Sequence, residues 1–276
     1  MDTQAAEAIL REAGAAADED IDLARTALAF AACVRPEAGE ERFAEHLRQL
    51  IDDVAREAAS RAGSPEALAA ALRTVLVERH GYHGDRETYD DLGNADLSQV
   101  IERKRGLPVA LSILWLHAGR GQGWSLDGLN FPGHFVLRLE AGGSRLILDP
   151  FNDGQALDTN DLRALLKSFA GEKAELDTAH YQALPNRAIL LRLQNNIKIR
   201  LLNANAYDQA LPVLERMLLV APKDPALWRE AGLVHRQLEN LRAAITCLET
   251  ASGLAEAPAA RQRIAAEIAA LKSKLN

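Results

Sequence analysis

Two side chains in the middle of the sequence, His134 and Asp149, are of the types that nucleophilic catalysis uses. His134 opens the segment HFVLRLE, and Asp149 closes the segment SRLILD. Between them stands Ala141-Gly142-Gly143, which predicts a tight turn and therefore a β-hairpin. The open ends of a hairpin are neighbours, so we expect the two side chains to lie close together. A carboxylate beside an imidazole is the orienting half of a catalytic triad.

The third member of such a triad should stand at the start of a facing helix, where the helix dipole lowers the pKa of a thiol. The apolar run PVALSILWLHAGR predicts a buried helix whose first residues are Gly106-Leu107-Pro108. Proline suits the first turn of a helix because that position needs no N–H donor. Proline has no nucleophilic atom, so Pro108 itself cannot be the third member of a triad.

The motifs GLPVALS, NFPGHF and LDPFNDG lie within residues 94–154. Together they resemble the transglutaminase-like domain of the bacterial SirB-type proteins, which also end in tetratricopeptide repeats. The resemblance extends over nearly the whole chain. It implies a cysteine-protease-like core in which the family histidine falls on His134, the family aspartate on Asp149 and the cysteine position on Pro108.

Other residues could supply a nucleophile. Ser112 lies one helical turn after Pro108 and faces the same side, although a small hydroxyl there can instead bond back to the helix. Cys33 and Cys247 stand in amphipathic helices, where a buried, inert thiol is the simpler interpretation. Two interpretations of His134 and Asp149 stay open: a structural or ligand-binding pair, or a working dyad.

A metal site is the alternative use of histidine and carboxylate in this chain. His80, His83 and Asp85 have a spacing that could hold zinc with one open position. They stand in a glycine-containing stretch, residues 80–96, that we expect to be a flexible loop. The two cysteines of the chain are too few for a disulfide framework or a cysteine zinc site. We therefore expect no metal and no cofactor.

The elements that must position these residues follow from periodicity and turn signals. Residues 4–62 have helical spacing, and Ser64-Pro65 begins a further helix that extends to about His80. After the loop at 80–96 we expect a helix at 97–106, the buried helix from 108, a strand at 124–131 and the hairpin. A charged linker should follow the turn at 149–154 and extend to about residue 186. The prediction is an α+β core in which a buried helix lies on a small antiparallel sheet.

The C-terminal part repeats itself. Leu191 and Pro225 stand 34 residues apart, the period of tetratricopeptide repeats, and the small residues Ala210 and Ala244 align in that register. The first repeat has Lys198 where glycine is usual, and Pro258 opens a capping helix. The first helix of each pair lines the concave groove, where polar side chains can clamp a peptide. The inward positions are Arg192, Asn195, Asn196, Arg229, Glu230 and Arg236.

Chain length and net charge limit the number of domains and the classes of partner. At 276 residues the chain is long enough for more than one domain, and we expect residues 1–62, 63–186 and 187–276 to form a helical region, the core with its linker, and the repeats. Acidic residues outnumber basic ones, 39 to 32, for a net charge of −7, which argues against nucleic acid as a partner. We expect no membrane span and no signal peptide, and hence a cytoplasmic location.

These observations predict a non-thiol, transglutaminase-like pseudoenzyme that acts as a protein-binding or scaffolding module through its repeats. The partner would be a protein or peptide. The alternative is a hydrolase or acyltransferase that uses His134 and Asp149 with an unrecognised nucleophile. The oligomeric state is not predicted.

Overall fold

The structure, a computed structural model, describes residues 2–39, 41–61 and 63–275. The chain groups into two compact units. The first contains Asp18–Leu193 and the residues up to Ala6, and the second contains Glu7–Ala17 and the residues from Gln194 onward. The three-part division at residues 62 and 186 stays a prediction, and residue 62 lies outside the described residues.

Most of the first unit is helical, as predicted. Its helices are α2 (Leu23–Ala32), α3 (Glu41–Ala58), α4 (Pro65–Arg73), α5 (Leu97–Arg103), α6 (Pro108–Arg120) and α7 (Thr159–Ala170). The predicted start of α4 is confirmed, since Ser64 Oγ accepts a hydrogen bond of 3.3 Å from the backbone N–H of Ala67. The helix then continues as a π-helical turn, Thr74–Arg79, before it ends at His80.

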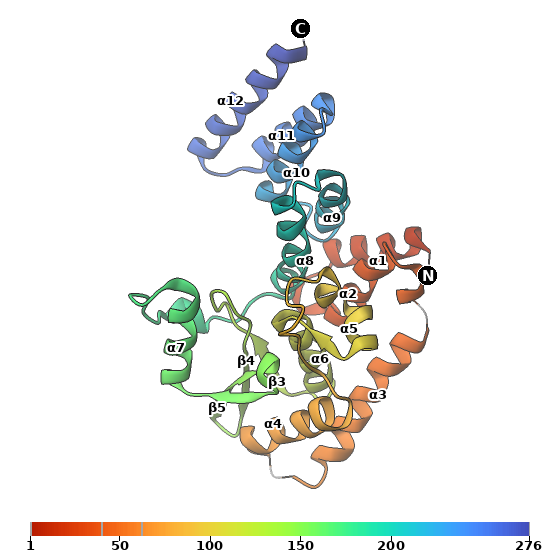
Figure 1. Ribbon diagram of the computed structural model, residues 1–276, viewed down its shortest axis with the longest axis vertical. Helices are drawn as coiled ribbons and strands as arrows, with labels where there is room; N and C mark the ends of the chain where they lie inside the picture. Colours follow the sequence, from red (N-terminus) through yellow and green to blue (C-terminus); the bar gives the residue numbers. More distant parts are fainter. Residues whose placement is uncertain (1, 40, 62, 276) are drawn as a thin grey trace. The chain divides into compact units, whose positions relative to one another are not determined.

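Helix α6 is the centre of this unit. Leu111, Leu114 and Trp115 are almost fully buried, as the apolar run predicts. In Figure 1 the strands lie on one side of α6 and α3 lies on the other. Because every face of α6 meets another element, the first turn of α6 is held firmly in place.

The main sheet is antiparallel, with the order β3-β4-β5-β6. The strands are β3 (Ser125–Gly128), β4 (Leu137–Ala141), β5 (Ser144–Asp149) and β6 (Gln155–Leu157). The predicted hairpin is confirmed: Ala141 pairs with Ser144, and Gly142 and Gly143 have φ of +57° and +78°. Two consecutive residues with positive φ are the requirement of a tight hairpin turn, which glycine meets without strain.

The prediction of a charged linker after residue 154 was wrong. This segment contains β6, α7 and a 3-10 helix, Thr178–Tyr181. A capping box begins α7: Asp158 accepts from the N–H groups of Asn160 and Asp161, and Asp161 accepts from the N–H of Asp158. Leu162 and Leu166 are then buried against the sheet.

Two smaller differences concern residues 80–106. The expected loop contains a strand, β1 (His83–Gly84), that pairs in parallel with β2 (Arg105–Gly106). Helix α5 therefore ends at Arg103 rather than at Gly106. Lys104 ends it with a left-handed backbone, φ +58°, which turns the chain into β2.

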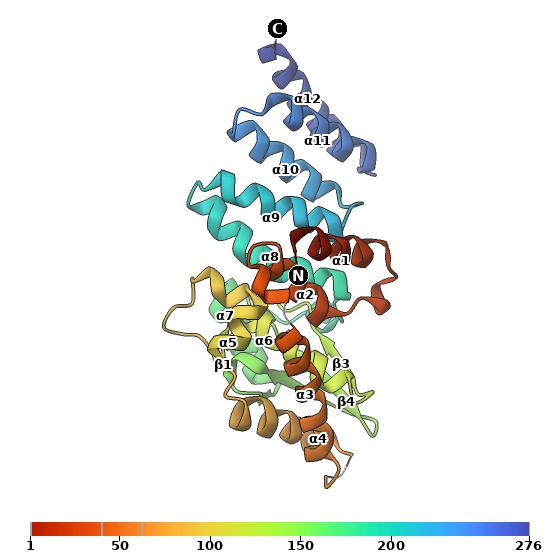
Figure 2. The ribbon, with the colours of Figure 1, turned by 90° about the vertical axis from the view of Figure 1, so that its right-hand side faces the viewer.

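Helix pairs build the second unit. Helix α8 (Asn186–Asn203) begins in the first unit, and its part from Gln194 onward belongs to the second. It leads into α9 (Tyr207–Val220), α10 (Pro225–Gln237), α11 (Leu241–Leu254) and α12 (Pro258–Leu275). Both views show α9 to α12 stacked in chain order (Figures 1 and 2). A Cβ atom on Gly232 would lie 2.9 Å from Leu248 Cγ, and Ala244 is fully buried. The small residues of the predicted repeat are thus where two helices touch.

Most of the first helix, α1 (Thr3–Ala15), also belongs to the second unit. Gly14 lies directly against the backbone of Leu219 in α9, where a Cβ atom would clash. Figure 2 shows α1 beside α9. Sequence periodicity placed α1 with the other N-terminal helices, because it carries no information on contacts between residues this far apart in the chain.

Candidate functional site

His134 and Asp149 are in direct contact. Nε2 of His134 lies 2.9 Å from Oδ2 of Asp149, and the two side chains are 5 % and 1 % exposed. The hairpin register explains this, because Leu137 pairs with Leu148 and the residues just outside that pair meet at the open end. The structure therefore brings together the two residues that the sequence singled out.

The carboxylate of Asp149 is saturated with donors. Oδ1 accepts from the backbone N–H of Phe151 and of Asn152, at 3.0 and 3.3 Å, and Oδ2 accepts from Nδ2 of Asn152 at 2.6 Å. Asp149 thereby caps a short 3-10 helix, Pro150–Asn152. A carboxylate can only accept hydrogen bonds. The hydrogen atom of its bond with His134 is therefore carried by Nε2 of the imidazole. Nδ1 is then the ring nitrogen that a reacting group would have to use.

Two aromatic rings cover the imidazole of His134. Phe169 stacks on it with a centroid distance of 6.0 Å and an interplanar angle of 22°, and Phe151 meets it edge-on at 5.9 Å. Gly133, with φ +71°, makes room for Phe169. Phe169 belongs to α7, the helix that the sequence analysis missed, and 52 % of its surface is exposed. The ring of His134 is thus enclosed by a side chain that itself faces solvent.

Arg192 fixes the chain segment in front of β4. Its Nη2 atom donates to the carbonyl oxygens of Phe131, at 2.7 Å, and of His134. Its guanidinium group lies over the ring of Phe135. Burial lowers the pKa of Arg192 from its ordinary value. The prediction that Arg192 lies in the repeat groove was wrong, because its side chain binds the backbone of the core.

The candidate nucleophiles do not complete a triad. Pro108 is the first residue of α6 and is buried. Ser112 is fully buried, and its Oγ has no hydrogen-bond partner in the described part of the chain, so it does not bond to His134. Cys33 and Cys247 are both buried and follow or lie in other helices. Among the described residues, none forms the nucleophile-to-base hydrogen bond that this chemistry requires.

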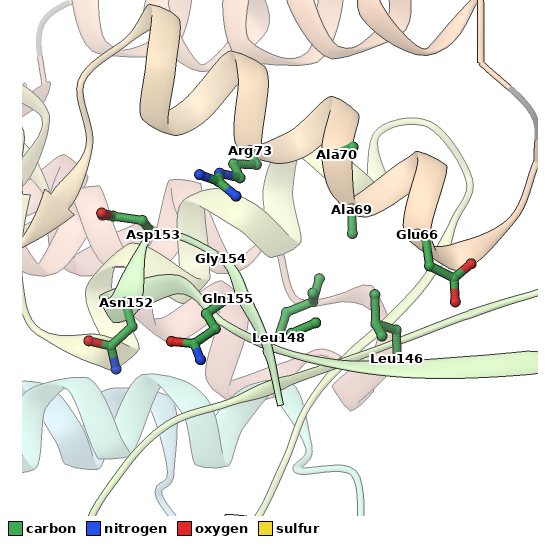
Figure 3. A pocket seen from close by; sticks show the side chains of 11 residues that line it. Glu66, Ala69, Ala70, Arg73, Leu146, Leu148, Asn152, Asp153, Gly154 and Gln155 are labelled. Atoms are coloured by element: carbon green, nitrogen blue, oxygen red, sulfur yellow. The ribbon is translucent and has the colours of Figure 1, made fainter. Parts of the chain in front are cut away.

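A pocket of about 530 Å³ lies beside the turn that carries Asp149 (Figure 3). One wall comes from α4, with Glu66, Ala69 and Arg73, and the opposite wall from the strands and the turn. Figure 3 shows Arg73 near Asp153 at one end and Glu66 near Leu146 at the other. Neither His134 nor Asp149 lines this pocket. Both apolar and polar side chains line it, a mixture that binding pockets commonly have.

A second pocket, of about 390 Å³, lies on another side of the same turn. It is lined by His83, Arg86, Arg105, Phe151 and Asp153 among others, and again by neither member of the buried pair. Asn152 links this surface to the interior, because it accepts from Arg86 and donates to Asp149.

The residues considered for zinc have separate partners. Nε2 of His80 lies 2.6 Å from Asp53, Nδ1 of His83 lies 2.8 Å from Asp153, and Asp85 accepts from Thr88. Within residues 2–39, 41–61 and 63–275, no three His, Cys, Asp or Glu side chains are grouped so that they could hold a metal.

The predicted groove residues of the repeats differ in whether their side chains are already bound by other residues of the chain. Arg229 forms a two-pronged ion pair with Glu267 of α12, with Nε 3.1 Å from the carboxylate. Asn196 accepts from Arg200 at 3.3 Å. Oδ1 of Asn195 is buried without a partner among the described residues, and Arg236 is exposed. Of these side chains, Arg236 is therefore the one whose exposed end a ligand could reach.

Lys198, which replaces the usual glycine of the first repeat, is buried and ion-paired with Glu230 of α10. The pair joins the first helix of one repeat to the first helix of the next.

Sequence reasoning missed Asn152, Phe151 and Phe169. Asn152 stands in the motif LDPFNDG, so its type and position were visible. The role of Phe169 in covering His134 could be seen only once α7 was known.

None of the helices in the described ranges is long and apolar enough to cross a membrane.

Comparison with known proteins identifies both parts of the chain. A model of the transglutaminase-like superfamily matches residues 41–195, and a tetratricopeptide-repeat model matches residues 197–271. A UPF0162 protein of Xylella fastidiosa is 32 % identical over 242 residues, which cover 84 % of this chain and 83 % of that protein. A UPF0162 protein of Vibrio cholerae is 34 % identical over 233 residues, covering 83 % and 86 %.

Protein SirB1 of Salmonella typhimurium is 27 % identical over 205 residues, which cover 74 % of this chain and 76 % of that protein. No solved structure matches. The chain therefore belongs to the UPF0162 family, the SirB-type transglutaminase-like proteins that end in tetratricopeptide repeats.

Proposed function

We propose that this protein is a transglutaminase-like pseudoenzyme that binds a protein or peptide partner through its repeat unit and works in the cytoplasm. The core would serve as a scaffold and as a second binding surface. Tetratricopeptide repeats present helical grooves that commonly bind protein segments.

One observation carries this proposal: the histidine that a catalytic reaction would need is enclosed. His134 is 5 % exposed, lies between Phe151 and Phe169, and gives Nε2 to Asp149. The position from which a thiol would attack is Pro108. A catalytic base must reach the proton that it abstracts, either directly or through one water. Here one ring nitrogen, Nε2, is bonded to a buried carboxylate and the ring is almost fully covered, as in a structural histidine.

Affinity capture with the full-length protein tests the proposal. Capture from lysate, followed by mass spectrometry, would compare the wild type with Asn195→Ala/Arg236→Glu and with His134→Ala. We expect a specific partner that the wild type and His134→Ala retain and that the groove variant loses. Arg236→Glu is preferable to a change at Arg229, because Arg229 holds Glu267 and its loss would disturb α12. A partner set unchanged in the groove variant would contradict binding through this groove.

A second function is favoured by the hydrogen bond between His134 and Asp149 itself. The bond of 2.9 Å fixes the tautomer of the imidazole and leaves Nδ1 as a base, which is the arrangement that a hydrolase or acyltransferase needs. Such an enzyme would require Phe169 to move and water to act as the nucleophile. A hydrolytic activity that disappears in His134→Ala, in protein that is still folded, would support this alternative.

A further inference from the structure

Helix α7 carries Phe169, the aromatic cover of His134, and is attached to its unit through apolar side chains. Leu162 and Leu166, which are 2 % and 1 % exposed, are its buried residues. They pack in one cluster with Leu129, Phe131, Val136 and Ile147. Figure 1 shows α7 on the outer side of the strands, away from α6. The helix is therefore a peripheral element that two leucines hold against the sheet.

Polar contacts do not fix α7 to the rest of the unit. In the described part of the chain, its side-chain hydrogen bonds and its ion pair all join residues between 158 and 175. They are the capping box of Asp158 and Asp161, the contacts of Arg163 with Asn160 and Glu175, and the bond from Ser168 to the carbonyl of Leu165. An element that is held by few buried apolar contacts opens more readily than the core around it.

The two ends of α7 are suited to movement of the helix while the sheet stays intact. Strand β6 ends at Leu157, and Asp158 caps the helix directly after it. At the other end Gly171 has φ +92°, a conformation that glycine adopts without strain, and nothing lies within 4 Å of its Cβ position. The residues from 171 to 173 are exposed. Both ends thus have the character of hinges, in which a few residues absorb the change in backbone angles.

Phe169 is the part of α7 that closes the site. Its ring stacks on the imidazole of His134. A Cβ atom at Gly133 would lie 2.5 Å from Cβ of Phe169, so this side chain occupies space that glycine leaves open. Phe169 is 52 % exposed, whereas His134 beneath it is 5 % exposed. Because Nε2 of His134 is bonded to Asp149, withdrawal of this ring would uncover an imidazole whose other nitrogen, Nδ1, is available.

We propose that α7 is a lid over His134, with Phe169 as its plug, and that it opens by detaching Leu162 and Leu166 from a sheet that stays folded. The lid controls the access of groups in solution to Nδ1 of His134. While the lid is closed, the histidine is enclosed as a structural residue would be. This lid is independent of the proposed function, because it governs access to the core and not binding through the repeats.

A thiol beneath the lid reports its opening. Val136 is fully buried in the cluster that Leu162 and Leu166 complete, so Val136→Cys places a small apolar thiol there. Val54→Cys is the matched control, because Val54 is equally buried but belongs to α3. Each full-length variant would be treated with iodoacetamide, and labelling at the introduced position would be followed by peptide mass spectrometry. We expect labelling at position 136 to be at least tenfold faster than at position 54. Equal or slower labelling at position 136 would overturn the lid.

Loosening the attachment of α7 tests the link to His134. Added to both cysteine variants, Leu166→Ala should speed labelling at position 136 several-fold and leave position 54 unchanged. Carbethoxylation of His134 by diethyl pyrocarbonate should rise in parallel. Lys167→Ala, on the same helix but outside the cluster, should change neither rate. Equal acceleration at positions 136 and 54 would show global destabilisation and overturn the lid. Faster labelling at position 136 with unchanged modification of His134 would overturn the role of Phe169 as plug.

Hydrogen exchange of the wild type gives a readout that needs no variant. A helix of twelve residues is marginal on its own, so the amides of α7 exchange while it is detached. We expect exchange in α7 to be at least tenfold faster than in the paired residues of β4 and β5. Equal protection of α7 and this hairpin would overturn the lid. None of these outcomes involves a partner protein, so binding through the repeats is decided separately by the capture experiment.

Discussion

Asn152 donates a hydrogen bond of 2.6 Å to the same carboxylate oxygen of Asp149 that receives Nε2 of His134. The amide is held in turn by Arg86, so a chain of contacts leads from the surface to the enclosed histidine. This arrangement supports a structural role for the pair, because each polar atom of the carboxylate is occupied by a fixed donor of the same turn.

Asp149→Ala should therefore destabilise the core strongly. The change leaves the backbone N–H groups of Phe151 and Asn152 and one ring nitrogen of His134 without their acceptor. Each unsatisfied buried group costs about 1–3 kcal/mol, and we expect a total loss of about 3–5 kcal/mol in the free energy of unfolding. Urea unfolding of the full chain measures it.

The matched control is Asp153→Asn in the same turn. Asp153 is half exposed and has φ +56°, a backbone conformation that asparagine accepts readily. We expect a change below about 1 kcal/mol, because the exposed pair with His83 contributes little. Equal losses in the two variants would show that the turn, and not the buried carboxylate, determines stability.

Removing the aromatic cover should expose the histidine. Phe169→Ala deletes the ring that stacks on His134, and since Phe169 is 52 % exposed, the loss of stability should stay within about 2 kcal/mol. Carbethoxylation of His134 by diethyl pyrocarbonate, followed by peptide mass spectrometry, should become several-fold faster. Equally fast modification in the wild type would contradict the enclosure of the ring.

Much of this fold is predictable because its signals are local. The turn at Gly142-Gly143, the start at Ser64-Pro65 and the small residues of the repeats each describe contacts within one hairpin, helix end or helix pair. These elements were predicted from residue types and spacing alone. They were sufficient to bring His134 and Asp149 together, because a hairpin register converts sequence positions into neighbours.

What was missed depends on contacts distant in sequence, with one exception. Residue spacing does not predict that Gly14 packs against Leu219, or that Arg192 binds the loop at Phe131. Helix α7 is the exception: Asp158 and Asp161 have the spacing of a capping box, and Leu162 and Leu166 follow at helical spacing. It was predicted to be part of a charged linker, although its share of charged residues is no higher than that of the whole chain, and the cover over His134 was missed with it.

Gly232→Ala should destabilise the repeat unit. A Cβ atom there would meet Leu248 Cγ at 2.9 Å and the carbonyl of Ala244 at 3.1 Å, so α10 and α11 must separate. Overpacking of this kind costs about 1–3 kcal/mol. Gly253→Ala is the control, since nothing lies within 4 Å of its Cβ position and alanine favours the helix. Thermal unfolding should give a lower Tm for the first and an unchanged or higher Tm for the second.

Stability should fall as the pH falls from 7 to 5.5. Burial lowers the pKa of His46 to about 4, with further contributions from Lys104 and His80, while Asp53 acts in the opposite sense. Lys104 can only donate to the hydroxyl of Tyr82, at 3.1 Å, so that hydroxyl is free to donate to Nε2 of a neutral His46, at 2.6 Å.

The unfolded chain takes up the proton near pH 6.5 and the folded chain does not, so acid favours unfolding. Over this interval His46 should contribute a loss of about 1 kcal/mol in the free energy of unfolding. Urea unfolding at both pH values should show that loss reduced in His46→Gln. An identical loss in wild type and variant would assign the pH dependence to other groups.

The proposal that the core does not catalyse acyl transfer is best tested by intact-protein mass spectrometry with acyl donors. The full-length wild type would be incubated with p-nitrophenyl acetate and with a glutamine-containing peptide, and His134→Ala would be treated in parallel. We expect no covalent adduct on any residue of the core and the same slow background release of p-nitrophenol in both proteins. An acyl adduct on a core residue that forms in the wild type and is absent in His134→Ala would contradict it.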